Sequence, residues 1–556
     1  MVGGSSSLNH LNQKIVILLF FYFLIPGILP AQQDNTRIFY RIFFTDKGTY
    51  SAADFSLEEL FTPRAVERRK KTGQTAPDFH DIPVYSEYIE KLSSTGLSLH
   101  CTSRWMNSAL FGSSVPADTE ELESMQFIKL IQEITVNDLK GPSSEKLEFS
   151  LTEDDTHEYT LPLEMLNGLN LQNSGFTGKG ILIAVLDAGF ANAGRISSLE
   201  NLMNRNGIKG TYDFIEKSDN VYAFHDHGTA VLSILAGNLP GELAGSAPDA
   251  SYLLLRTEDH FAEYPAEEDF WTAGAEYADS LGADIISSSL GYCTFDNPSY
   301  DYKYSDLDGK TAFVTKAAGI AASKGIVVVN SAGNERDNDW KYIIAPSDAE
   351  NVLSVGAVDI NREISAFSSA GPSYDGRVKP DITAMGVAVP LQVNEMYVEK
   401  SNGTSFSCPL ISGMCACLMQ AVPLASGAHI VNSVRISSDR YLFPDSLYGY
   451  GIPDFETALQ KLQEEFVFIP SGAPVVSPNP FTDRITVTFA EDPATLSIEI
   501  FNLNGKLMFS RNYNNFAGRS ATLEVFSNFA EGMYLMRIKT ARGASVHRII
   551  RINGRP

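Results

Sequence analysis

Three things are scarce in this chain of 556 residues: cysteine, positive charge and long apolar runs. Five cysteines are too few for a scaffold held together by disulfides. Lys and Arg number 43 against 67 Asp and Glu, a net charge of −24, so no general positive field attracts nucleic acid. Charged residues (20%) and apolar residues (44%) occur in ordinary globular proportions, which argues against disorder and against a polytopic membrane protein.

An unbroken apolar run lies near the N-terminus, at residues 15–24, directly after Lys14. It is shorter than the roughly 20 apolar residues that span a membrane. Ala31 then offers a small residue for cleavage before Gln32. We therefore interpret residues 1–31 as a signal peptide, with an uncleaved anchor as the alternative. No later run reaches spanning length without charges, so no stable transmembrane segment is expected in the exported chain.

The remaining sequence divides into four regions. Residues 32–155 mix strand and helix signals and end in a polar, acidic stretch. Residues 156–466 alternate β-branched runs with helical patterns, which predicts an α/β fold, a parallel sheet with helices on both faces. A Pro- and Gly-containing linker covers 467–480. Residues 481–556 alternate apolar and polar side chains with period two, which predicts an antiparallel β-sandwich.

The elements of the central region follow from its apolar runs and their periodicity. The expected strands are 181–186, 252–255, 283–286, 326–329 and 352–358. The expected helices are 229–235, 268–280, 311–322 and Thr404–Ala421.

Four polar residues stand where these elements begin or end. Asp187 follows one apolar strand and Asn334 follows another, whereas His227 and Ser405 lie where helices begin. Ligand sites in such sheets lie beyond the carboxyl ends of the strands. Taken singly, each residue is equally well explained as a cap or a turn residue.

In combination, these segments resemble the subtilisin-like serine proteases (subtilases, the S8 family). D-x-G at Asp187, H-G-T at His227, A-G-N ending at Asn334 and G-T-S-x-x-x-P around Ser405 occur in the family order. The resemblance covers about residues 160–460. It implies a subtilisin-like fold, a serine-type endopeptidase and polypeptide substrates.

Acyl transfer explains why these residue types are needed together. The Ser405 hydroxyl is a weak nucleophile until a base takes its proton. His227 titrates near neutral pH and suits that task, while Asp187 would hold its tautomer and stabilise its cation. Asn334 and the Ser405 backbone N–H would form the oxyanion hole. This chemistry requires no cofactor.

The resemblance also indicates where a substrate would lie. Ser289, Leu290 and Gly291 are expected to present a backbone edge to which an extended peptide adds as a strand. Ala332 and Gly333 are expected beside it. Main-chain pairing tolerates many sequences, so we expect a broad endopeptidase, and the sequence does not indicate which side chain it prefers before the scissile bond.

Two other functions are open at this point. A catalytically silent subtilase fold would bind peptides in the same groove without turnover. His225, Asp226 and His227 could hold a metal ion, but no H-E-x-x-H motif and no cysteine pair with zinc spacing accompanies them, so no metal ligands are predicted. Structural calcium is left open, because no EF-hand loop identifies a site for it.

The cysteines allow two interpretations. Cys408, Cys415 and Cys417 fall on one expected helix, where neighbours are too rigidly spaced to bridge. We expect buried thiols, with a Cys293–Cys408 disulfide as the alternative.

The region before the catalytic domain, 32–155, resembles a subtilase propeptide by its position, so the chain's own propeptide is an expected partner. Autocleavage is expected near residues 140–160. The basic run at 68–71 is expected to be a solvated helix face, with a processing site as the alternative.

The C-terminal region resembles a type A sorting domain of the type IX secretion system, on residues 478–481, 502–505 and 532–538. That resemblance implies contact with the secretion machinery, passage across the outer membrane, and a secreted or cell-surface protein. The alternative is a β-sandwich that binds carbohydrate or a surface, because a fold alone fixes no function.

Overall fold

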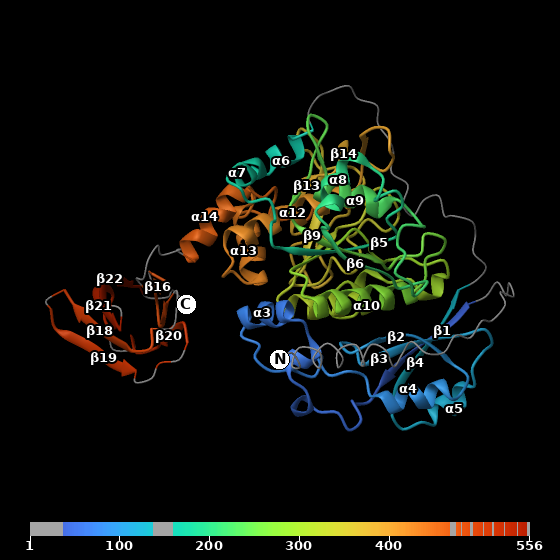
Figure 1. Cartoon of the computed structure of the whole chain (residues 1–556), viewed down its shortest axis with the longest axis horizontal. Coiled ribbons are helices and arrows are strands. Elements are labelled where there is room, and N and C mark those ends of the chain that lie inside the picture. The colour runs from blue at the N-terminus through green and yellow to red at the C-terminus, as the bar shows by residue number, and fades with distance from the viewer. Residues whose placement is uncertain are drawn as a thin grey trace, which may run out of the picture. The chain divides into compact units, whose positions relative to one another are not determined.

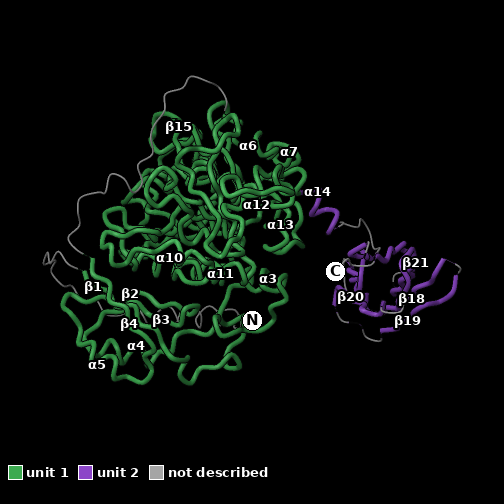
Figure 2. Tube along the Cα trace, turned by 180° about the vertical axis from the view of Figure 1, so that it is seen from behind, with its two compact units in different colours: residues 1–458 green, residues 459–556 purple. Residues whose placement is uncertain are grey.

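The computed structural model describes residues 37–136, 159–466 and 474–552, apart from 480, 490–492, 504, 514–515, 517, 527–528 and 542. The expected signal peptide, nearly all of the expected autocleavage segment and more than half of the expected linker lie outside these residues. The chain forms two compact units, Met1–Ala458 and Leu459–Pro556 (Figure 2).

The N-terminal region contains an antiparallel sheet with helices beside it. The strand order is β2 (Ser98–Ser103), β3 (Ser108–Ser113), β1 (Arg37–Phe44) and β4 (Ile128–Val136). The longer helices are α3 (Pro63–Lys71) and α4 (Ser86–Ser93). Helix α3 begins where the sequence favours it, because the Thr62 hydroxyl accepts from the Ala65 N–H and Pro63 needs no intrahelical donor.

A parallel sheet of seven strands forms the centre of the first unit. Its order is β13 (Ile382–Met385), β12 (Leu353–Val358), β11 (Val327–Ser331), β10 (Ile285–Ser288), β5 (Leu182–Asp187), β9 (Ser251–Arg256) and β6 (Ile208–Asp213). Every neighbouring pair is parallel. Strands β5, β10, β11, β12 and β13 are buried throughout, as a sheet covered on both faces requires.

Helices lie on both faces of this sheet. Helix α12 (Thr404–Ala421) packs on α9 (His227–Ala236) and on β10 to β13. Helix α10 (Ala266–Leu281) packs on β5 and on α11 (Phe313–Ser323), across the sheet from α9 (Figure 1). The expected α/β fold is confirmed. Among the described residues, no helix combines the length and apolar character that crossing a membrane requires.

The second unit contains two antiparallel sheets around one apolar core. The first sheet has the order β16 (Val475–Ser477), β17 (Ile485–Thr488) and β20 (Ser520–Leu523). The second has the order β19 (Leu507–Tyr513), β18 (Leu496–Asn502), β21 (Gly532–Thr540) and β22 (Gly543–Arg551). Alternate residues of β17 and β18 are buried, as the period-two pattern predicted.

Helix α10 packs on both sheets: it contacts β2 of the N-terminal sheet and β5 of the central sheet (Figure 1). Phe39 and Trp105 of the N-terminal region share one apolar cluster with Phe270 and Trp271 of α10. A buried ion pair also joins the two regions, because Arg41 Nε of β1 donates to Asp269 Oδ2 of α10 (2.7 Å). The N-terminal region is therefore bound to the central region through both apolar packing and buried ion pairs.

The basic run of α3 is not the solvated face that the sequence predicted. Arg68 and Arg69 are buried, and both pair with Asp279 of α10; Arg69 also pairs with Asp81 (2.9 Å). The prediction was wrong because the acidic partner lies far along the chain and appears only when α3 packs on α10. The exposed members of the run are Lys70 and Lys71.

We expect Arg69→Ala to lower the free energy of unfolding of the full-length protein by about 3–5 kcal/mol, because it leaves buried carboxylates with less compensating charge. Lys70→Ala removes the same charge from an exposed position of the same helix and should change it by less than about 0.5 kcal/mol. Urea unfolding followed by tryptophan fluorescence measures both variants. Equal midpoints for the two would contradict the buried network.

Candidate active site

Three adjacent strands end at the same edge of the central sheet. β10 lies between β5 and β11, with Ser288 in register with Leu186 on one side and Asn330 on the other. The residues at the ends of these strands and just beyond them therefore lie at one edge of the sheet. They include Asp187, Ser289 and Asn334, and the first turns of α9 and α12 add His227 and Ser405.

Asp187 and His227 form a buried hydrogen-bonded pair. His227 Nδ1 lies 2.8 Å from Asp187 Oδ1, and the two residues are 3% and 0% exposed. The Ala188 N–H also donates to this oxygen (2.8 Å). Helix α9 starts very close to the end of β5: a Cβ on Gly228 would lie 2.5 Å from the Gly189 carbonyl oxygen. Only glycine allows this approach, which explains the H-G-T sequence at this position.

Two opposing effects act on the His227 imidazole. Burial lowers its pKa, but the charge of Asp187 and the hydrogen bond to it raise the pKa by more, with smaller contributions from Asp226 and Glu258. The net pKa is raised above the usual value for histidine. Asp187 thus stabilises the imidazolium that forms when His227 takes a proton.

The neighbouring His225 supports the start of helix α9. Its Nδ1 accepts a hydrogen bond from the His227 backbone N–H (3.0 Å), in the place of a conventional side-chain cap. Burial and the nearby His227 lower the pKa of His225. Both Nδ1 atoms are committed to protein hydrogen bonds, so these nitrogens do not serve the metal-site alternative.

Ser405 lies in the first turn of α12 and is 9% exposed. Its hydroxyl donates to the Ser289 carbonyl oxygen at 3.4 Å, and the Ser289 hydroxyl donates to the Ser405 carbonyl oxygen at 2.8 Å. The following residue, Phe406, has its ring centroid 5.9 Å from that of His227. The ring of the residue after Ser405 thus lies near the imidazole of His227, and the Ser405 hydroxyl itself is hydrogen-bonded to Ser289.

The side-chain amide of Asn334 has a fixed orientation. Both the backbone N–H and the hydroxyl of Thr404 lie 2.9 Å from Asn334 Oδ1. Since a backbone N–H can only donate, the atom facing it must be the oxygen, and this assigns Nδ2 to the other side. The amide nitrogen remains available to an acceptor beside Ser405.

A cavity of about 320 Å³ brings most of the expected substrate residues together. Ser405 and Asn334 line it with Ser289, Leu290, Gly291 and Gly333. Ala332 is buried and is not part of the lining. The Leu290 carbonyl oxygen accepts one hydrogen bond from Asn330 Nδ2 (2.9 Å), and a carbonyl oxygen has two lone pairs.

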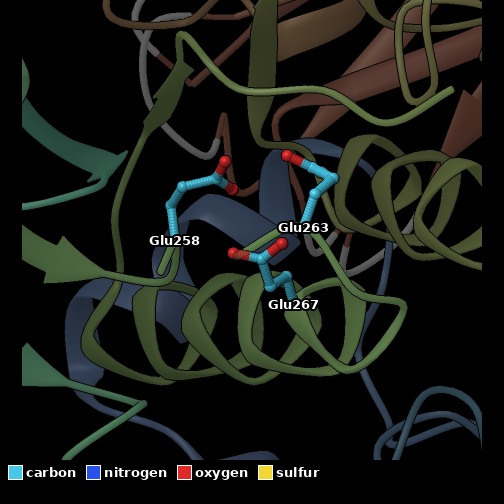
Figure 3. A group of neighbouring side chains, drawn as sticks. All are labelled: Glu258, Glu263 and Glu267. Atoms are coloured by element: carbon cyan, nitrogen blue, oxygen red, sulfur yellow. The ribbon is translucent and has the colours of Figure 1, made fainter. Parts of the chain in front are cut away.

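Carboxylates that the sequence analysis did not identify also line this cavity. They are Glu258, Glu263, Asp296 and Glu335. Figure 3 shows Glu258 and Glu263 converging with Glu267, and one oxygen of each lies within 4.8 Å of the others. Oxygen ligands of this kind suit a hard cation such as calcium. The Asp259 and Tyr264 N–H groups, however, already donate to Glu267 (2.7 and 3.2 Å), which gives it a structural role at the start of α10.

All five cysteines are free thiols. Cys408 is buried and lies 3.5 Å from the carbonyl oxygens of Ser288 and Val329, so the Cys293–Cys408 alternative is not observed. Burial raises the pKa of Cys408 to about 12, which keeps it protonated and unreactive at neutral pH.

Comparison with known proteins gives matches to three family models. The subtilase family matches residues 178–451, the Bacteroidota peptidase S8 propeptide domain matches 39–148, and the secretion system C-terminal sorting domain matches 475–553. Among solved structures, MycP1 from the ESX-1 type VII secretion system is 22% identical with a TM-score of 0.46, over 60% of this chain and 94% of that one.

Curated relatives cover the same catalytic region. Subtilisin E of Bacillus subtilis (strain 168) is 28% identical over 312 residues, 55% of this chain and 73% of the relative. The major intracellular serine protease of the same organism is 30% identical over 270 residues, 47% of this chain and 75% of the relative. The chain belongs to the subtilase family. This subtilase is a serine-type endopeptidase.

The flanking domains of the subtilase fit a secreted protease. The propeptide match includes the N-terminal sheet that packs on α10. The sorting-domain match covers the strands of the second unit and indicates export by type IX secretion to the cell surface or the medium. The expected propeptide and sorting modules are confirmed.

Replacing Asp187 with Asn should lower the pKa of His227, because the charge that outweighs burial is lost and burial then dominates. Asp226→Asn removes a weaker electrostatic contribution, from a more exposed side chain, and should lower the pKa of His227 by less. NMR titration of the His227 imidazole in the three proteins measures the difference. If the pKa of His227 in Asp187→Asn equals that of the wild type, the charge of Asp187 does not offset the effect of burial, and the explanation given above is wrong.

Proposed function

We propose that this secreted subtilase hydrolyses polypeptides through an acyl-enzyme on Ser405, with His227 as general base and Asp187 as its buried partner. The observation that carries the proposal is the 2.8 Å Asp187–His227 pair at the start of α9, a helix that packs on α12, together with the cavity that Ser405 and Asn334 both line. The hydrolysis uses protein groups and water alone.

The first half of the reaction forms the acyl-enzyme. Asp187 holds Nδ1 of His227, which leaves Nε2 to take the proton from the Ser405 hydroxyl. The serine oxygen then attacks the carbonyl carbon of the scissile bond, and the carbonyl oxygen becomes an oxyanion. His227 returns the proton to the leaving amine as the C–N bond breaks.

The second half releases the acyl group. Water gives a proton to His227 and attacks the ester carbonyl, and the imidazolium then protonates Ser405 as the C–O bond breaks. Both tetrahedral intermediates carry an oxyanion. Asn334 Nδ2 and the Ser405 N–H would stabilise it, since the first turn of a helix leaves its N–H groups without intrahelical acceptors.

Flanking regions would control when and where this site works. We propose residues 1–31 as the export signal, 32–155 as the propeptide, 156–466 as the catalytic domain, 467–480 as the linker and 481–556 as the part that the secretion machinery binds. The buried ion pairs between the propeptide and α10 support a stable zymogen.

Ser405→Ala is expected to abolish peptide hydrolysis, with a loss of about 10⁶ in kcat, the magnitude known for loss of the serine in subtilisin. Ser323→Ala, an exposed serine at the end of α11, is the matched control and should keep full activity. Casein and peptide turnover measure both. Undiminished turnover in Ser405→Ala would refute the assignment, and a wild type without turnover would instead support a peptide-binding protein.

Asn334→Ala should reduce kcat by about 10²–10³ and change KM little, as established for an oxyanion-hole amide in subtilisin. The interaction strengthens only when the oxyanion forms, so it acts on the transition state. Steady-state kinetics with one peptide separates the two constants. A raised KM with an unchanged kcat would show that Asn334 binds substrate rather than stabilising the oxyanion.

A further inference from the structure

A second cavity lies between the propeptide and helix α11. Its volume is about 590 Å³, within the span of about 300–1,000 Å³ that is usual for small-molecule sites. The propeptide wall includes the end of β1, the loop between β2 and β3 and the start of β4, and α11 supplies much of the other wall. Among the described residues, none lines both this cavity and the one beside Ser405, so the two are different sites.

Helix α11 is attached to the propeptide near both of its ends. The ring of Phe313, the first residue of the helix, lies 6.0 Å from the ring of Phe43 on β1. Directly after the last residue of the helix, Lys324 Nζ pairs with Asp81 (3.0 Å). The lining residues of α11 all lie between these two contacts. A Cβ added to Gly319 would meet no atom from another part of the described chain within 4 Å, so the helix face is open there.

Every charged side chain in the lining is positive. Lys129 belongs to the propeptide, Lys310 and Lys316 belong to the other wall, and the described lining contains no Asp or Glu. All three lysines are exposed, and none forms an ion pair within the described part of the chain. The chain as a whole has the opposite balance, with 67 Asp and Glu against 43 Lys and Arg. Three such lysines around one cavity provide a local positive field that attracts an anion.

Large apolar side chains form much of the remaining wall. Phe43, Trp105 and Met106 contribute from the propeptide, and Ile320 contributes from α11. Trp105 is buried, and Met106 and Ile320 pack on the apolar cluster that includes α10. An apolar ligand placed against these side chains loses contact with water, which favours its binding. The cavity therefore combines an apolar inner wall with a positive rim.

We propose that this cavity binds an anionic amphiphile: a molecule with one carboxylate or phosphate group on an apolar chain, as in free fatty acids and single-chain lipid phosphates. The chain lies along Phe43, Met106 and Ile320, and the anionic group lies at the rim with Lys129 and Lys316. These lysines belong to opposite walls, so one bound anion contacts the propeptide and α11 together. Binding therefore stabilises the attachment of the propeptide to the catalytic region.

The test measures amphiphile binding to the intact chain by isothermal titration calorimetry at low salt. Ser405→Ala prevents the expected self-cleavage, and mass spectrometry verifies that the propeptide is still attached. Decanoate, decyl phosphate and decylammonium have the same apolar chain and differ in the charged group. We expect one molecule of either anion to bind, at least about tenfold more tightly than the cation, which the exposed lysines repel. The anion that binds more tightly identifies the head group, and added salt should weaken both anions because it screens exposed charges.

Charge-removing variants assign the binding to this cavity. Lys129→Gln and Lys316→Gln each remove one charge, from opposite walls. Each should weaken decanoate binding about twofold to fivefold, the range of an exposed ion pair, and the double variant should weaken it about tenfold. Lys179→Gln removes an exposed charge that lies outside the cavity and should leave the affinity unchanged.

A variant that fills the cavity tests the apolar contact. Gly319→Leu places a side chain in the open space opposite the propeptide and should abolish the binding of both anions. Leucine favours a helix more than glycine does, so α11 should keep its structure. Circular dichroism and thermal melting verify this, and if the variant is destabilised, the lysine variants carry the comparison. With Gly319 in place, decanoate should raise the melting temperature of the intact chain, because it binds only the folded form.

Three results would overturn the proposal. A cation that binds as tightly as the anions would show that the lysines do not select the ligand. An unchanged affinity in the double lysine variant would place the ligand elsewhere on the chain. If neither anion binds, the cavity is not a site for this class of ligand. None of these results bears on peptide hydrolysis by Ser405, which casein turnover tests separately.

Discussion

A buried carboxylate held against an imidazole is the interaction on which the site depends. Asp187 is fully buried, and its Oδ2 has no hydrogen-bond partner among the described residues. Its charge would be costly there without a compensating group, and His227 supplies one at 2.8 Å. The same low-polarity surroundings that make the charge costly also strengthen its attraction for an imidazolium. The catalysis that we propose therefore depends on β5 ending inside the protein, where α9 can start against it.

Much of this arrangement could be predicted from the sequence because it is local. The apolar runs identified β5, β10, β11 and β12, and four short motifs identified the residues at their ends. Two strands were not predicted: β6, most of whose residues are partly exposed, and β13, whose four residues lie in a loop-rich segment. The period of an apolar run is informative only when the strand is long enough or buried enough to show it.

Long-range charge pairing could not be predicted in the same way. Arg68 and Arg69 form part of a basic run, yet they are buried because α10 offers Asp279. Glu258, Glu263 and Asp296 of the cavity come from loops without a motif, and the signal for them is the absence of Lys and Arg from residues 257–302. This acidic segment has two uses in the fold: α10 binds arginines of the propeptide, and the adjoining loops line the cavity beside Ser405.

The most direct test of the account is the pH dependence of covalent labelling by a fluorophosphonate, with the modified residue identified by mass spectrometry. We predict a single adduct on Ser405. The labelling rate should fall on the acid side with a midpoint above about 6.5, the unperturbed value for histidine, because Asp187 raises the pKa of the base that must be neutral. An adduct on another residue, or a rate on Ser405 that does not change with pH in this range, would contradict the claim that His227 activates it.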